Sequence, residues 1–79
     1  MNVRILYFAS LRDAAGRDSE DVAASGGDAR ALYDDLRRRH GFALPPERVR
    51  VAVNGEFAGW ERALRDGDEV AFLPPMSGG

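Results

Sequence analysis

The sequence has 79 residues, of which 44% are apolar and 30% charged, and these proportions are typical of one small globular domain rather than of a disordered chain. The formal net charge of −2 argues against nucleic acid as the main partner, and the absence of cysteine excludes disulfides, thiolate nucleophiles and thiolate metal sites. No apolar run approaches the ~18 residues of a membrane span, so we expect a cytoplasmic protein with no membrane partner.

The first predicted element is a strand over residues 2–10, NVRILYFAS, where β-branched and aromatic residues follow one another without a breaker. A second and weaker strand is predicted over residues 19–24, SEDVAA. Turn signals around Gly16 separate the two, so we expect a hairpin closed by a long loop.

A helix is predicted next, because both of its ends carry a capping signal. Asp28 follows two glycines at the position of an N-cap, and Gly41 stands where a C-cap glycine belongs. The apolar residues between these two recur at helical spacing: Ala29, Leu32, Tyr33 and Leu36.

The end of this predicted helix carries a run of three arginines, residues 37–39. The run lies at helical ion-pair spacing from Asp34 and Asp35, and a helix C-terminus favours cations. We therefore expect a solvated face that complements the helix dipole rather than a nucleic-acid site. His40, at the same helix end, is expected to have a cap or dipole role rather than a catalytic one.

Three strands are predicted in the second half of the chain. Arginine or alanine alternates with valine over residues 48–53, RVRVAV, and this alternation predicts a strand. Asn54-Gly55 predicts a type I′ turn, since both residues tolerate positive φ, and residues 56–58 would return as a short partner strand. The final strand is predicted over residues 69–73, EVAFL, after a turn at residues 66–68.

These elements predict an α+β fold, with a mixed sheet of about five strands and one main helix packed on one face. The first and last strands hold the most continuous apolar sequence, so we expect them to be the central, parallel pair. Trp60 and Leu64 are expected to close one end of the core. The predicted domain covers residues 1–73, and residues 74–79 form an extended tail.

The tail, PPMSGG, carries the most informative residues of the sequence. Two successive glycines at a chain end are expected by chance about once in 200 chains, although a frayed terminus is the simple alternative. Pro74 and Pro75 lack N–H donors, so strand pairing should stop at Leu73 and the chain should leave it extended. Met76 to Gly79 then reach at most about 14 Å further, which suits insertion into the active site of another protein.

The carboxylate of Gly79 is the functional group that this tail offers. It is ionised at neutral pH and a poor electrophile, so it needs activation, most economically as an acyl-adenylate made from ATP. The sequence has no glycine-rich phosphate loop and no lysine to hold phosphates. We therefore expect no bound cofactor and no metal, and we expect the activating enzyme to be a separate protein.

Three stretches resemble the small subunits of molybdopterin synthase, a family of ubiquitin-like β-grasp sulfur carriers: YFASLRDAAGRDSEDV, VAVNGEFAG and LRDGDEVAFLPPMSGG. The most specific marks are the DGDEVAF turn and strand, the Pro-Pro-x-x-Gly-Gly end and, near the start, Phe8, Ala9, Arg12 and Gly16. The resemblance covers nearly the whole chain and implies that the domain over residues 1–73 is a β-grasp.

The resemblance also implies a mechanism. Gly79 would be adenylated by a ubiquitin-activating-like adenylyltransferase and converted to a thiocarboxylate, while Gly78, Ser77, Met76 and the two prolines thread the tail. The tail would enter the large subunit of a heterotetrameric synthase and give its sulfur to cyclic pyranopterin monophosphate, in molybdenum cofactor biosynthesis. The chain would then be a carrier rather than a catalyst on its own, and the sulfur donor stays open.

Other functions share some of these features. A related carrier could supply sulfur for thiamine or cysteine synthesis or for tRNA thiolation, with the same chemistry and a different acceptor. A ubiquitin-like protein modifier is an alternative of another class, although the absence of lysine excludes chains built on its own side chains. A structural adaptor that ends in two glycines is the least favoured.

Strand alternation predicts a docking surface on the sheet face away from the helix. Phe8, Phe57 and Leu73 should lie on the same side as the strand arginines Arg4 and Arg50, beside the root of the tail. Scattered surface hydrophobes are common, but three of them beside a reactive tail favour a partner-binding site. A comparison with the family points to the same three positions.

Overall fold

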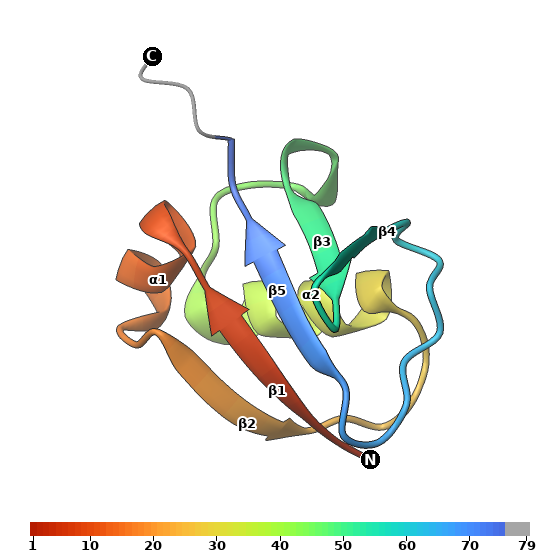
Figure 1. The fold of residues 1–79 in the computed structure, drawn as a ribbon. Helices are drawn as coiled ribbons and strands as arrows, with labels where there is room; N and C mark the ends of the chain where they lie inside the picture. The colour runs from red at the N-terminus through yellow and green to blue at the C-terminus, as the bar shows by residue number, and fades with distance from the viewer. Residues whose placement is uncertain (76–79) are drawn as a thin grey trace.

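The computed structural model describes residues 1–75 (Figure 1). The elements in chain order are β1 (Asn2–Tyr7), α1 (Ala9–Ala15), β2 (Ser19–Ala23), α2 (Ala29–His40), the 3₁₀ helix η1 (Pro46–Arg48), β3 (Arg50–Val53), β4 (Glu56–Ala58) and β5 (Glu69–Leu73). The strands form one sheet in the order β2-β1-β5-β3-β4, in which β1 and β5 are parallel and the other neighbours antiparallel. The predicted mixed sheet, with its first and last strands paired near the centre, is confirmed.

One face of the sheet and α2 enclose the core. Alternate residues of β1 and β5 point to this face, and the buried residues of α2 are the ones predicted from helical spacing. The largest side chains among them that are fully buried are Ile5, Tyr7, Tyr33, Leu36, Val70 and Phe72. In Figure 1, α2 crosses behind the sheet, which leaves the facing side without a helix.

The predicted caps fix α2 at both ends. Asp28 Oδ1 accepts a hydrogen bond from the backbone N–H of Ala31 at 2.9 Å, as an N-cap side chain does. Gly41 has a φ of 72°, and its N–H donates to the carbonyl of Arg37 at 2.8 Å. Both predicted caps are confirmed.

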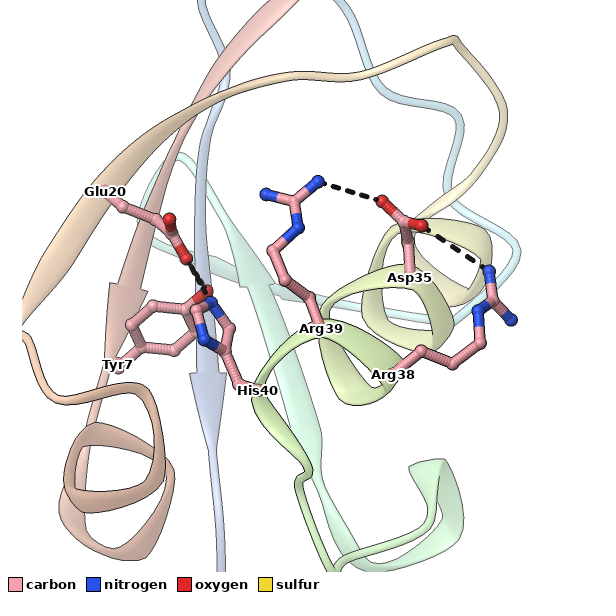
Figure 2. A network of polar contacts seen from close by, with 6 residues as sticks. All are labelled: Tyr7, Glu20, Asp35, Arg38, Arg39 and His40. Atoms are coloured by element: carbon pink, nitrogen blue, oxygen red, sulfur yellow. Dashed lines mark hydrogen bonds and ion pairs between the residues drawn. The ribbon is translucent and has the colours of Figure 1, made fainter.

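Two of the three arginines at the end of α2 form ion pairs of the predicted kind, both with Asp35, whereas Arg37 Nε donates a hydrogen bond to the carbonyl of Phe42. Asp35 lies 3.5 Å from Arg38 and 3.4 Å from Arg39, and Figure 2 shows both arginines folded back toward it. Asp34 instead forms an ion pair with Arg30, one turn earlier, at 3.9 Å. These pairs are exposed, so each contributes at most about 0.5 kcal/mol, and the run is a solvated helix face.

The strand predicted over residues 2–10 is too long, because the chain turns after Phe8 and forms α1. Ala9 has a φ of 49°, which breaks the extended backbone. Leu11 is the single buried residue of α1, and Gly16 closes the helix with a φ of 75°. Because α1 buries only one side chain, its sequence has no apolar periodicity that would predict a helix. Gly16 at its end is the one signal that the sequence contains.

A strand is predicted over residues 48–53, but the observed strand β3 begins at Arg50, two residues later than predicted. Pro46 is the first residue of η1, where its fixed φ and missing N–H are no disadvantage. The N–H of Arg48 then donates to the carbonyl of Pro45 at 2.9 Å, and these bonds compete with strand pairing. The alternating pattern therefore predicts the strand correctly only from Arg50 onward.

The remaining predicted features agree with the structure. Asn54 and Gly55 have φ values of 53° and 84°, which confirms the tight turn between β3 and β4. Leu64 is buried, and Trp60 packs on the core with its ring stacked on Phe72 at 5.9 Å. No helix within residues 1–75 is long and apolar enough to cross a membrane.

Candidate functional site

The root of the tail lies at the C-terminal end of β5, the central strand of the sheet. β5 is flanked by β1 and β3, and strand pairing ends at Leu73 as predicted. Pro74 is buried and Pro75 is exposed, so the chain leaves the fold between these two residues. Figure 1 shows it leaving from the end of β5. The remaining predicted tail residues, Met76, Ser77, Gly78 and Gly79, lie outside the described residues.

The predicted docking residues all lie on the face of the sheet opposite α2. Phe8 is 43% exposed and Phe57 is 62% exposed, and these are the large hydrophobic residues exposed within residues 1–75. Leu73 is half-buried. Its neighbour Phe72 points into the core, so strand alternation turns Leu73 outward.

Phe57 and Leu73 share a groove, which we call the tail-root groove. It has a volume of about 440 Å³ and is lined by Glu47, Arg48, Val49, Arg50, Phe57, Leu73, Pro74 and Pro75. In the register of the sheet Leu73 lies opposite Arg50, and Phe57 lies opposite Ala52. The two apolar side chains therefore stand on either side of β3.

Phe8 lines a different hollow. The β1–β5 register pairs Tyr7 with Phe72, which places Phe8 level with Leu73 one strand away. Phe8 contributes, however, to a hollow of about 310 Å³ near the start of α1, with Arg12 and Asp18 on its wall. The structure thus brings the three predicted residues to one face, with two of them in one groove and the third beside it.

Arg50 adds a feature that the sequence did not show. Its guanidinium carbon lies 4.2 Å from the centroid of the Phe57 ring, a cation–π arrangement. Strand alternation placed the two residues on one face, but residues on different strands touch only in a particular register and rotamer. The open face therefore presents a positive charge set among apolar side chains.

His40 belongs to a polar network on the helix side of the sheet. It stands in the last turn of α2 as predicted, but its Nε2 lies 2.6 Å from Glu20 Oε1, which also accepts a hydrogen bond from the hydroxyl of Tyr7 at 2.5 Å (Figure 2). The Glu20 and His40 side chains are 10% and 15% exposed. The network joins β1, β2 and the end of α2, which indicates a structural role.

The pKa values within this network agree with that role. Burial raises the pKa of Tyr7, and the bond to Glu20 raises it further, so the hydroxyl keeps its proton. Burial would also raise the pKa of Glu20, but the bonds from Tyr7 and His40 outweigh it and lower the pKa. Glu20 is therefore ionised and hydrogen-bonded to two side chains, which indicates a structural role rather than that of a catalytic acid or base.

The described part of the chain contains no group of three or more acidic or histidine side chains that could hold a metal ion. Its buried side-chain polar atoms all have hydrogen-bond partners. The chemical contribution of residues 1–75 is therefore a binding surface. It is a face with exposed aromatic rings and an arginine, and the tail leaves it at the end of the central strand.

Residues 5–79 match the protein-family model described as the ThiS family. The chain is 36% identical to the molybdopterin synthase sulfur carrier subunit of Escherichia coli, over 98% of this chain and 99% of that protein. It is 37% identical to the subunit of the same name from Mycobacterium tuberculosis, over 100% and 99% of the two chains.

Solved structures with the same fold include SAMP1 from Haloferax volcanii, with a TM-score of 0.82 and 29% identity over 100% of both chains. The crystal structure of the Amycolatopsis orientalis BexX/CysO complex contains a chain that matches with a TM-score of 0.71 and 28% identity, over 98% of this chain and 99% of that one. The predicted ubiquitin-like β-grasp is therefore the observed fold.

Proposed function

The chain belongs to the ThiS family, and from that membership we propose that it is the sulfur carrier subunit of molybdopterin synthase. The observation that carries the proposal is the full-length similarity to proteins with that name. The geometry supports it, because β5 delivers the tail from the centre of the sheet, beside exposed aromatic rings on which a partner can rest.

In this proposal the reacting group of the chain is the terminal carboxylate of Gly79. In the proposed sequence a carboxylate oxygen attacks the α-phosphorus of ATP on a partner enzyme, diphosphate leaves, and an acyl-adenylate forms. A sulfur nucleophile then attacks the acyl carbon and displaces AMP, which leaves a thiocarboxylate. The thiocarboxylate sulfur finally bonds to a carbon of cyclic pyranopterin monophosphate, and water hydrolyses the acyl–sulfur bond, which leaves the sulfur on the pterin and restores the terminal carboxylate for another cycle.

The rest of the tail has a guiding role in this proposal. Pro74 and Pro75 direct the chain away from β5, since neither can donate to a neighbouring strand. Met76, Ser77 and Gly78 would thread the narrow entrance of the partner, and a glycine has no Cβ to obstruct it. Phe8, Phe57 and Leu73 would hold the partner against the open face of the sheet.

Two partners complete the proposal. The solved complex of BexX and CysO contains a chain of this fold, which supports the assembly of such a carrier with another subunit. We take the acceptor here to be the large subunit of molybdopterin synthase, and the activating partner to be a ubiquitin-activating-like adenylyltransferase. ATP is then a substrate of that enzyme, the carrier holds no cofactor of its own, and the cycle takes place in the cytoplasm.

Deletion of Gly79 tests this function directly. Incubation of the wild-type chain with the adenylyltransferase, ATP and a sulfur donor should replace one oxygen atom by sulfur at the C-terminus, which intact-mass measurement detects. The deletion variant should unfold at the wild-type temperature, because Gly79 lies beyond β5, and should transfer no sulfur. Omission of ATP is the control, and modification at another residue or full activity of the deletion variant contradicts the proposal.

A protein modifier is the second candidate, because the solved structures with this fold include small archaeal modifier protein 1 from Haloferax volcanii. In that case the activated carboxylate would form amide bonds with lysines of other proteins. Mass spectrometry of the tail after expression in the native host separates the two functions: amide-linked partners favour the modifier, and a free thiocarboxylate favours the sulfur carrier.

A further inference from the structure

Arg50 lines the tail-root groove. In the β3–β5 register it is opposite Leu73, and its guanidinium covers the ring of Phe57 at 4.2 Å. The cation is therefore flanked by the two apolar residues of the groove. A guanidinium that lies on a ring keeps its N–H donors at its edges, where an acceptor from another molecule can reach them.

Among the described residues, Arg50 has no acidic partner. Within residues 1–75, six arginines form ion pairs and none of them lines the groove: Arg4, Arg12, Arg17, Arg30, Arg38 and Arg39. In the same part of the chain, neither Arg50 nor Arg48 pairs with an acid, although Glu47 is also on the wall of the groove. The groove thus carries two positive charges against one negative charge, on a chain whose net charge is −2.

We propose that Arg50 is a specificity-determining residue of the docking surface, and that it binds a carboxylate on the large subunit that receives the tail. The inference rests on the proposed function, because it takes that subunit as the occupant of the groove. The groove defines what the occupant offers: an apolar side chain that covers Phe57 and Leu73, with a carboxylate at its edge. The planar fork of Arg50 binds both carboxylate oxygens together, which a lysine could not do.

The apolar surroundings make this charge selective. When a partner covers Phe57 and Leu73 it also removes water from Arg50, and a charge pair in such a place is screened less than one at the surface. A partner without a carboxylate there would bury the arginine unpaired, which weakens its binding. A partner with a carboxylate at this position therefore binds more tightly than a partner that makes the same apolar contact without one.

Three substitutions at Arg50 separate charge from packing. Arg50→Glu reverses the charge, Arg50→Met keeps an apolar stem on Phe57, and Arg50→Lys keeps the charge without the planar fork. Arg38→Glu is the matched control, since it makes the same change in net charge on α2, which covers the other face of the sheet. Arg50 is exposed, so thermal unfolding should show that all four variants fold.

The measurement is the dissociation constant for the purified large subunit, by calorimetric titration at low and at high salt. At low salt we expect Arg50→Glu to weaken binding by at least about tenfold, Arg50→Met by less, and Arg50→Lys by the least of the three. High salt should weaken the wild-type complex and leave the Arg50→Met complex nearly unchanged. Arg38→Glu should bind within about twofold of the wild type at both salt concentrations.

The outcomes that contradict the inference are distinct from failure of the proposed function. Wild-type affinity of Arg50→Glu and Arg50→Met overturns the inference alone, as do equal losses in both variants that salt does not change. If Arg50→Glu does not fold, the difference between Arg50→Met and Arg50→Lys decides the question, and equal affinities overturn the inference. No binding of the wild-type chain to the large subunit overturns the proposed function and this inference together.

Discussion

Asp68 is the one charged residue that is buried within residues 1–75, at 8% exposure, and both of its carboxylate oxygens have donors. Oδ1 accepts from the side-chain amide of Asn54 at 2.9 Å, and Oδ2 accepts from the backbone N–H of Arg65 at 2.8 Å. Asn54 Oδ1 in turn accepts from the N–H of Glu69 at 2.9 Å. This small network fastens the turn after β3 to the start of β5, so a single carboxylate stabilises the centre of the sheet.

These donors lower the pKa of Asp68, the Arg65 N–H first and the Asn54 amide second. A carboxyl group with a lower pKa in the folded state contributes stability above its unfolded pKa of about 3.9 and loses it as the pH falls through the folded value. We expect Asp68→Asn to lower the free energy of unfolding at neutral pH by about 1–2 kcal/mol. Its difference from the wild type should shrink below about pH 4, as urea unfolding across pH will measure.

Asp13→Asn is the matched control for this experiment. Asp13 is exposed on α1 and takes part in none of the side-chain hydrogen bonds or ion pairs found within residues 1–75. The control should therefore unfold at the wild-type urea concentration at every pH. A penalty for Asp68→Asn that stays constant into acid would show that the charge of Asp68 does not stabilise the fold.

Contacts between distant side chains are the part of the structure that the sequence could not predict. Tyr7 and Glu20 are 13 residues apart, and Glu20 and His40 are 20 residues apart. Their bonds exist only after β1 pairs with β2 and α2 docks on the sheet. The cation–π contact of Arg50 with Phe57 has the same origin, whereas the side of the sheet on which each residue lies followed from alternation alone.

A comparison of the helices and strands shows which local sequence signals are sufficient to predict an element. α2 was predicted at both ends, because a cap side chain, a terminal glycine and four buried residues at helical spacing agree with one another. α1 was missed, since it has no side-chain N-cap and buries only Leu11. The C-terminal strand was predicted to the residue, because Pro74 ends the pairing that Leu73 can still join.

The turn between β3 and β4 gives a prediction at this scale. Gly55 has a φ of 84°, and a Cβ added there would meet no atom within 4 Å, so a substitution is opposed by backbone conformation alone. We expect Gly55→Val to lower the free energy of unfolding by about 1–3 kcal/mol, because a β-branched residue disfavours positive φ. Gly55→Asn is the control and should be nearly neutral, since asparagine tolerates this region. Equal urea midpoints for the two variants would show that the turn does not constrain the fold.

The two faces of the sheet have different roles: one holds the core that stabilises the fold, and the other presents the exposed side chains. The face toward α2 holds the core and the Tyr7–Glu20–His40 network, and its substitution should mainly affect stability. The open face holds Phe8, Phe57 and Leu73, which contribute little to the core because they are exposed or half-buried. The central position of β5 joins the two functions, since the strand that anchors the core also directs the tail.

This division predicts different outcomes for substitutions on the two faces. We expect Phe8→Lys and Leu73→Lys each to weaken binding to the two proposed partners, the large subunit and the adenylyltransferase, by at least about tenfold, on the order of 1.4 kcal/mol. Each substitution places a charge where a partner must exclude water. Phe72→Ala, one residue from Leu73 but turned into the core, should instead lower the free energy of unfolding by about 3–5 kcal/mol. Calorimetric titration of the folded variants and their thermal midpoints test both halves of the prediction. If Phe8→Lys and Leu73→Lys both bind the two partners with wild-type affinity, the open face takes no part in recognition and the partners recognise the tail alone.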